Sequence, residues 1–285
     1  MQESQAMPSH AGTYLFSIDL EDVRLLMPDG ERHAERVPQM TDRYLEWLAL
    51  RDARCTFFVV GDQAERYPEL IAQIAHAGHE IACHTSTHAP LTTMNAETFR
   101  ADLRRNVELI ERCGVARPVG FRAPVFSLTQ QTSWAHEVLA DEGFIYSSSV
   151  LPAASPLFGW PGFGQAPRRM QSGIVELPMS LARIGTMHIP IAGGVYFRAL
   201  PGWLVKRRMR RVMAHNKPLL GYFHPYDIDT GQERFMHPGI NNSRFYNWLM
   251  YRNRAGMLDR LDNALGNDTT IMTYRDHVAS LEGIL

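Results

Sequence analysis

The chain alternates short apolar segments with amphipathic helical segments along almost its whole length. Short apolar segments are typical of buried strands, and their alternation with helices favours parallel strands joined by right-handed crossovers. We expect strands at residues 14–19, 55–60, 80–83, 119–122, 145–148, 174–178, 219–223 and 270–273. We expect helices at residues 40–53, 68–77, 96–113, 132–143, 202–215 and 243–265. About seven such units exceed what a five-stranded open sheet needs, so we predict an α/β fold, a distorted (β/α) barrel with about seven parallel strands.

A length of 285 residues allows one large domain or two ordinary ones. Nothing in the composition marks a boundary, so we expect a single domain over residues 1–285. Residues 151–169 form the one long irregular segment, which is rich in proline and glycine. We expect this segment to border a pocket and to be more mobile than the strands.

The composition excludes several classes of protein. Apolar residues make up 45% of the chain and charged residues 21%, which excludes a disordered chain. The 29 basic and 30 acidic residues nearly cancel, which argues against a nucleic-acid partner. No apolar stretch is long enough to span a membrane, and the N-terminal sequence does not resemble a secretory signal. The three cysteines are odd in number and lack CxxC spacing, so we expect reduced thiols and a cytoplasmic location.

Acidic and histidine side chains follow two of the predicted strands. Asp19, Glu21 and Asp22 stand at the end of the first strand, and His84 and His88 follow the third. Two histidines four residues apart fall on one face of a helical turn, as shared metal coordination requires. One carboxylate would complete a site of two histidines and one carboxylate, which suits zinc and other divalent metals. An acidic surface turn and histidines packed in the core are the alternatives.

Two further polar residues end predicted strands. Arg122 closes the strand at 119–122, and taken by itself a surface arginine beside a turn proline is the simpler interpretation. A buried guanidinium would instead need a carboxylate, and Asp19 is the obvious partner. His224 directly follows the strand at 219–223, and its position favours a proton donor over a histidine packed in the core.

Taken in their order along the chain, these acidic, histidine and arginine motifs resemble those of the polysaccharide deacetylase family, the NodB-homology carbohydrate esterases. The resemblance extends over about residues 13–275. The resemblance is carried by residues 17–22 (SIDLED), 78–81 (GHEI), 84–88 (HTSTH), 121–124 (FRAP) and 222–225 (YFHP). Residues 56–61, 146–149, 176–178 and 193–198 are similar to the branch found in bacterial surface-polysaccharide gene clusters. The resemblance implies one metal-dependent catalytic domain that removes an N-acetyl group from a sugar of a polysaccharide or its precursor and releases acetate.

The first motif departs from the family pattern of two adjacent aspartates, a general base and a metal ligand. Here Leu20 and Glu21 separate Asp19 from Asp22, so either Asp22 or Glu21 could be the ligand. Asp19 continues the strand register, which supports it as the base. We favour Asp22 as the ligand because it lies two residues beyond the strand and can turn toward the histidines.

The resemblance also implies a role for each residue. Asp22, His84 and His88 would hold one divalent metal, most simply zinc, while Asp19 acts as the base. Arg122 would orient Asp19, and His224 would protonate the departing amine. Pro124, Trp160 and Tyr196 are expected to contact the sugar. The same scaffold acting on a cyclic imide or ureide is an alternative function, and a silent glycan-binding module is a weaker one.

Overall fold

The computed structural model describes residues 12–155, 158–214, 217–266 and 268–283. Its strands are β1 (Thr13–Leu20), β2 (Thr56–Val59), β3 (Glu80–Cys83), β4 (Gly120–Phe121), β5 (Tyr146–Ser147), β6 (Arg168–Arg169), β7 (Val175–Glu176), β8 (Ala182–Ile184), β9 (Met187–Ile189), β10 (Leu219–Phe223) and β11 (Thr270–Met272). Its α-helices are α1 (Val37–Ala49), α2 (Gly61–Arg66), α3 (Pro68–His76), α4 (Ala96–Arg112), α5 (Ala135–Asp141), α6 (Gly194–Ala199), α7 (Gly202–Met213), α8 (Arg244–Tyr251), α9 (Met257–Leu265) and α10 (Tyr274–Ser280). Its 3₁₀ helices are η1 (Val23–Leu26), η2 (Gly30–Arg32), η3 (Leu91–Thr93), η4 (Pro124–Phe126), η5 (Gln130–Thr132) and η6 (Pro225–Asp227).

One curled sheet of nine strands forms the centre of the described chain, in the order β10-β1-β2-β3-β4-β5-β7-β6 with β11 also paired to β1. All its pairings are parallel except that of β6 with β7. The strand β1 pairs with β10 along one edge, and with β11 and then β2 along the other. Within the described ranges β10 does not pair with β7 or β6, so the sheet is a half-barrel. The predicted parallel (β/α) architecture is confirmed.

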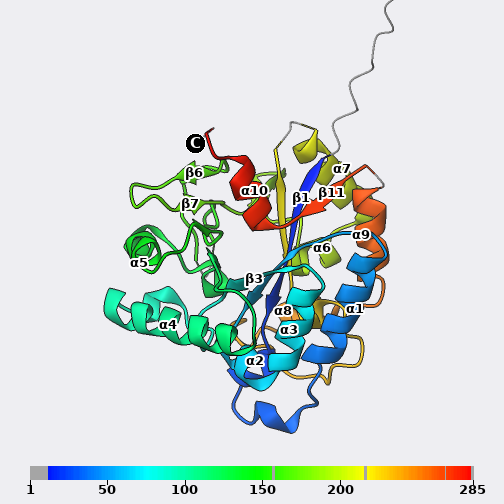
Figure 1. Ribbon diagram of the computed structural model, residues 1–285. Helices are drawn as coiled ribbons and strands as arrows, with labels where there is room; N and C mark the ends of the chain where they lie inside the picture. The colour runs from blue at the N-terminus through cyan, green and yellow to red at the C-terminus, as the bar shows by residue number, and fades with distance from the viewer. Residues whose placement is uncertain (1–11, 156–157, 215–216, 267, 284–285) are drawn as a thin grey trace, which may run out of the picture.

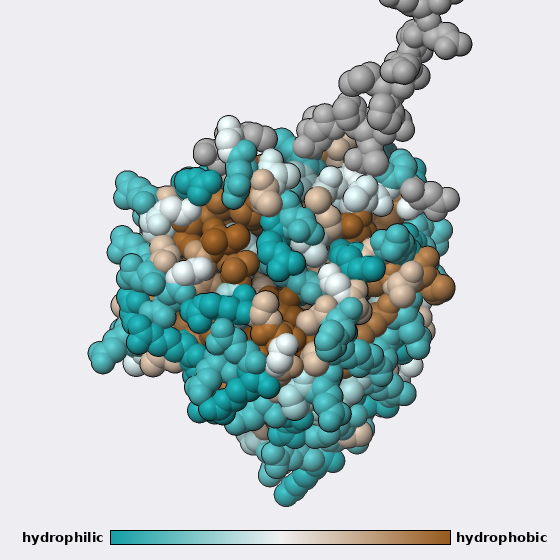
Figure 2. Space-filling model, viewed as in Figure 1, coloured by the Kyte–Doolittle hydropathy of each residue, from teal (hydrophilic) through white to brown (hydrophobic). Residues whose placement is uncertain are grey.

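Helices cover the outside of this sheet because the outer face of β1 is apolar. Tyr14, Phe16 and Ile18 point outward into a core formed with α1, α3, α7 and α9. The strands β4 and β5 are covered by α4 and α5, which lie on the opposite side of the molecule in Figure 1. The alternate residues of β1, which include Ser17 and Asp19, therefore point into the half-barrel. Most of the face in Figure 2 is hydrophilic, with hydrophobic side chains visible over the region of β6, β7 and α5.

A segment between β9 and α6 passes close to β10, where it contacts Tyr14 of β1. The Tyr14 hydroxyl donates a 2.5 Å hydrogen bond to the Ala192 carbonyl. A β-carbon on Gly221 would lie 2.1 Å from the Tyr14 hydroxyl oxygen and 2.3 Å from the Ala192 carbonyl oxygen. Only glycine leaves room for this crossing.

The structure differs from the sequence-based prediction in several elements. The helix predicted at 243–265 is two helices, α8 and α9, separated by an irregular break at residues 252–256. The hairpin of β8 and β9 was not predicted. The end of the helix predicted at 202–215 lies outside the described residues.

No described helix is long and apolar enough to cross a membrane. Cys55, Cys83 and Cys113 are buried free thiols.

Candidate active site

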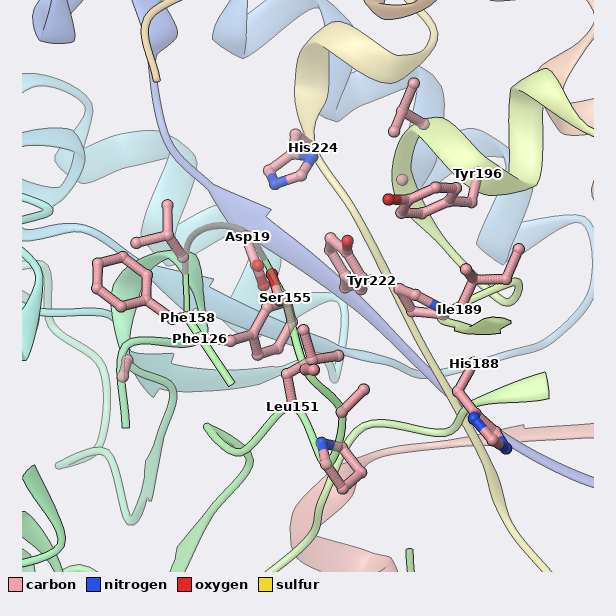
Figure 3. Close-up of a pocket in the computed structure, with 18 of the residues that line it drawn as sticks. Asp19, Phe126, Leu151, Ser155, Phe158, His188, Ile189, Tyr196, Tyr222 and His224 are labelled. Atoms are coloured by element: carbon pink, nitrogen blue, oxygen red, sulfur yellow. The ribbon is translucent and has the colours of Figure 1, made fainter. Parts of the chain in front are cut away.

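The carboxyl ends of four sheet strands surround one large cavity. Asp19 and Glu21 come from β1 and the turn after it, His84 follows β3, and His224 follows β10. Arg122 follows β4 and lies behind Asp19. The cavity has a volume of about 830 Å³, within the range of ligand pockets. Figure 3 shows Asp19, Tyr222 and His224 facing this space, and Leu151 and Phe158 among the other residues that line it.

The guanidinium of Arg122 is fully buried and holds Asp19. One terminal nitrogen donates to Asp19 Oδ1 at 2.6 Å and to Ser17 Oγ at 2.7 Å. The remaining nitrogens donate to the Ser148 carbonyl at 3.1 Å and the Tyr274 hydroxyl at 2.9 Å. A buried guanidinium needs such partners, and their fixed geometry leaves Asp19 a single orientation. The expected pairing of Arg122 with Asp19 is confirmed.

Glu21, His84 and His88 form the cluster that could hold a metal ion. One ligand atom from each lies within 4.8 Å of the other two. His84 Nδ1 lies 2.7 Å from the Arg122 carbonyl oxygen, so it donates there and leaves Nε2 as a lone-pair donor toward the cluster. Two imidazoles and one carboxylate are a donor set that suits zinc. The residues present therefore fit a divalent metal.

The two histidines meet through an irregular loop and not through the predicted helical turn. Thr85 and His88 both adopt left-handed backbone conformations, with φ of 62° and 57°. The loop is held by Gly61 N–H and Asn106 Nδ2, which donate to the Thr85 carbonyl. Left-handed residues other than glycine are strained, and they persist where surrounding contacts over-determine them. The result places the two imidazole centroids 5.0 Å apart.

Asp22 does not join the histidines, contrary to the prediction that favoured it as the ligand. Its carboxylate accepts hydrogen bonds from the Arg24 side chain at 2.6 and 2.9 Å, and from the Arg24 backbone N–H at 3.0 Å. It thereby caps η1 and is neutralised by a buried arginine. Glu21 occupies the position instead, and its Oε2 lies 2.5 Å from His88 Nε2.

The charges of the cluster depend on burial and on one another. Burial opposes ionisation of Glu21, but His88 and His224 outweigh burial and lower its pKa to about 2. Burial lowers the pKa of His84 to about 4, which keeps it neutral as a metal ligand must be. Burial also acts against protonation of His88, but Glu21 reverses the effect and raises the pKa.

His224 also lines the cavity, next to Glu21, and is held by Asp227. Its Nδ1 lies 3.0 Å from Asp227 Oδ2, and its Nε2 lies 3.7 Å from Glu21 Oε1. Arg198 donates to the other Asp227 oxygen at 2.8 Å, and Tyr226 stacks on the imidazole. Burial alone would lower the pKa of His224, but Glu21 and Asp227 raise it to about 9. Protonated His224 can therefore present an N–H to the cavity near neutral pH.

The walls of the cavity contain one of the three predicted sugar contacts. Tyr196 lines it, as Figure 3 shows, whereas Pro124 and Trp160 do not. Pro124 is buried in η4, and Trp160 packs against Phe163 away from the cavity. The segment 151–169 does border the cavity, through Leu151, Pro152, Ala153, Ala154, Ser155, Phe158, Pro161 and Gly162. Its mobility stays a prediction.

Several residues that shape the site were not predicted. Tyr274 lies two residues after the end of β11, so the rule that polar residues matter at strand ends could have identified it. Ser148 directly follows β5, so the same rule could have identified it, whereas Arg198 lies within α6 and carries no such signal. The β8–β9 hairpin adds Met187 and His188 to the cavity wall.

Comparisons with known proteins agree with this geometry. Residues 23–142 match the polysaccharide deacetylase family, and residues 148–278 match a domain of unknown function, DUF3473. The chain contains a polysaccharide deacetylase domain. Over 100 residues it is 30% identical to a peptidoglycan-N-acetylglucosamine deacetylase of Bacillus cereus, a match covering 35% of this chain and 36% of that protein. Over 92 residues it is 32% identical to a chitooligosaccharide deacetylase of Rhizobium leguminosarum bv. trifolii, covering 32% and 40%. The matches thus span about two fifths of these relatives.

Solved structures share the fold over nearly the whole chain. A protein from Mycobacterium smegmatis described as a polysaccharide deacetylase superimposes with a TM-score of 0.64 and 20% identity, covering 98% of this chain and 93% of that one. A family 4 carbohydrate esterase pseudoenzyme from Bacillus anthracis has a TM-score of 0.50 and 12% identity, covering 95% and 66%. Because a pseudoenzyme shares it, the fold alone does not establish activity.

The two matched segments of the chain both contribute to the cavity. The deacetylase domain supplies His84 and His88 to its wall and Arg122 behind Asp19, and the C-terminal segment supplies His224 and Tyr196. Glu21 and Asp19 precede the matched part of the deacetylase domain and enter the site through β1.

Proposed function

We propose that the protein is a metal-dependent hydrolase that removes an N-acetyl group from a sugar of a polysaccharide or its precursor and releases acetate. The observation that supports it most is the arrangement of Asp19 and His224 around the Glu21–His84–His88 cluster in one cavity. The relatives named as peptidoglycan and chitooligosaccharide deacetylases support an N-acetylated sugar as the substrate.

Hydrolysis of an amide adds water to the carbonyl carbon and then breaks the carbon–nitrogen bond. A divalent ion such as zinc, when held by Glu21, His84 and His88, acts as a Lewis acid toward the amide carbonyl and water. Asp19 accepts the proton of the attacking water through the carboxylate that Arg122 orients. His224 donates a proton from Nε2 to the departing amine nitrogen, so the products are acetate and a free amino sugar.

Tyr226 and Asp227 prepare His224 for this step. Asp227 accepts from the Nδ1 side of the ring, so the proton on Nε2 points to the cavity. Stacking of Tyr226 at a centroid distance of 4.5 Å fixes the plane of the imidazole.

Acetate release from N-acetylated sugars, measured with the zinc-loaded protein, tests the proposal. We expect release by the wild type, and a rate lower by about 10²–10⁴ in a His224→Ala variant that keeps its metal. Ring opening of a cyclic imide or ureide without any acetate release from sugars would contradict the proposal.

A further inference from the structure

The helix α8 has an aromatic face that the rest of the described chain leaves uncovered. No residue of this helix is buried, and Phe245, Tyr246 and Trp248 are 63%, 56% and 50% exposed. The rings contact one another, with centroids 5.7 Å apart for Phe245 and Tyr246 and 6.1 Å apart for Phe245 and Trp248. Exposed side chains of this size gathered in one place indicate a binding surface.

This aromatic face of α8 is continuous with the cavity. Tyr246 and Met250, which belong to the same helix, line the cavity together with Tyr196 of α6. Phe245 and Trp248 do not line the cavity, but Phe245 contacts Tyr246 and Trp248 contacts Phe245, so the two rings continue the surface that begins at Tyr246. A molecule that fills the cavity and continues beyond it can therefore lie across α8.

The charge of the cavity and the shape of the aromatic rings beside it favour an uncharged sugar chain. Among the described residues, no lysine or arginine lines the cavity, so it offers no fixed cation to a phosphate or nucleotide group. Aromatic rings combine a flat apolar face with low conformational entropy, which suits stacking against the C–H face of a sugar ring. The Arg252 guanidinium lies 4.7 Å from the centre of the Trp248 ring, so it covers one face of the indole and holds its orientation.

We propose that the aromatic face of α8 binds sugar units of an uncharged N-acetylated glycan chain while a neighbouring unit occupies the cavity. This inference rests on the proposed function, and it assigns Phe245 and Trp248 as residues that set a preference for chain length. A chain that reaches α8 gains contacts that a short sugar cannot make.

The experiment compares acetate release from N-acetylglucosamine oligomers of two and six units. It uses the zinc-loaded wild type, a Phe245→Ala/Trp248→Ala variant, and a Trp203→Ala control. Trp203 is 68% exposed on α7 and does not line the cavity, so it controls for the loss of any exposed indole. Because α8 contributes no buried residue, the variants should keep the wild-type melting temperature.

We expect the wild type to prefer the six-unit oligomer. In the α8 variant, the ratio of kcat/KM for six units to that for two units should fall by about tenfold, mainly through KM. The Trp203→Ala control should keep the wild-type ratio. Acetate release with the same ratio in the wild type and the α8 variant would overturn the inference and leave the proposed function intact.

Two other results would also overturn the inference. No acetate release from either oligomer by the wild type would contradict the proposed function on these sugars, and the inference with it. Binding of the wild type, but not of the α8 variant, to phosphatidylglycerol vesicles with an unaltered length preference would assign this face to a membrane surface.

Discussion

Arg122 donates a 2.6 Å hydrogen bond to Asp19, and both side chains are almost completely buried. The same guanidinium also contacts Ser17, Ser148 and Tyr274, which lie on or after β1, β5 and β11. The orientation of the proposed base is thus fixed by strands that are far apart in the sequence. Arg122 is therefore a positioning residue whose planar fork matters as much as its charge.

Arg122→Lys should lower kcat by on the order of 10², because lysine keeps the charge but cannot hold Asp19 and its other partners together. Tyr274→Phe removes a single hydrogen bond to Arg122 and should cause a smaller loss. Acetate release, with zinc content measured in parallel, checks both variants. A fully active Arg122→Lys variant would show that the branched guanidinium group is not needed to orient Asp19.

Asp227→Asn should move the alkaline limb of the pH–rate profile to lower pH. The Asp227 charge raises the pKa of His224 whether or not a metal neutralises Glu21, and the rate falls as pH rises through that pKa. Without the charge the pKa moves back toward about 6.5. Asp229→Asn is the matched control, since Asp229 is a buried aspartate that pairs with Arg36. An unmoved limb in Asp227→Asn would mean that another group supplies the proton.

His79 should make the fold less stable in mild acid. Its Nδ1 accepts a hydrogen bond from the Cys55 N–H, and burial lowers its pKa to about 4. The unfolded chain takes up this proton below about pH 6.5 while the folded chain does not, so stability is lost as pH falls from 6.5 to 4. At pH 5 this amounts to on the order of 2 kcal/mol. The free energy of unfolding, measured with urea at pH 7.5 and pH 5, should fall less between these pH values in His79→Asn than in the wild type. An exposed-histidine variant, His188→Asn, should behave as the wild type does.

The segment 151–169 should exchange its amide hydrogens faster than β1 and β2. The described residues of its N-terminal part make few backbone hydrogen bonds, such as those from Ala153 and Trp160 to the Leu151 carbonyl. Amides with few such partners open with little free energy. Hydrogen exchange followed by mass spectrometry checks this, and protection equal to that of β1 would contradict it.

The sequence was sufficient for the parallel architecture and for most of the proposed catalytic residues. Both depend on one rule, that the carboxyl ends of parallel strands meet at one edge, and Asp19, His84, Arg122 and His224 all stand at such ends. The location in the cytoplasm and the single domain over residues 1–285 stay predictions.

The choice between Glu21 and Asp22 could not be made from strand register alone. It depends on Arg24, whose side chain turns back to pair with Asp22 and caps η1. The placement of Trp160 likewise depends on packing against Phe163, which no local pattern shows. Contacts of this kind form between side chains only in the folded chain, so residue spacing does not show them.

Zinc binding by Glu21 and Asp22 variants tests the proposed metal site most directly. Titration calorimetry with zinc should give one site per chain in the wild type and in Asp22→Asn, since Asp22 only faces Arg24. Asp22→Asn should lose some stability through the unpaired Arg24 but keep its zinc affinity. Glu21→Gln should lose zinc affinity by at least tenfold, because a neutral amide replaces the carboxylate beside His88. Loss of zinc binding in Asp22→Asn together with full binding in Glu21→Gln would contradict the proposed site.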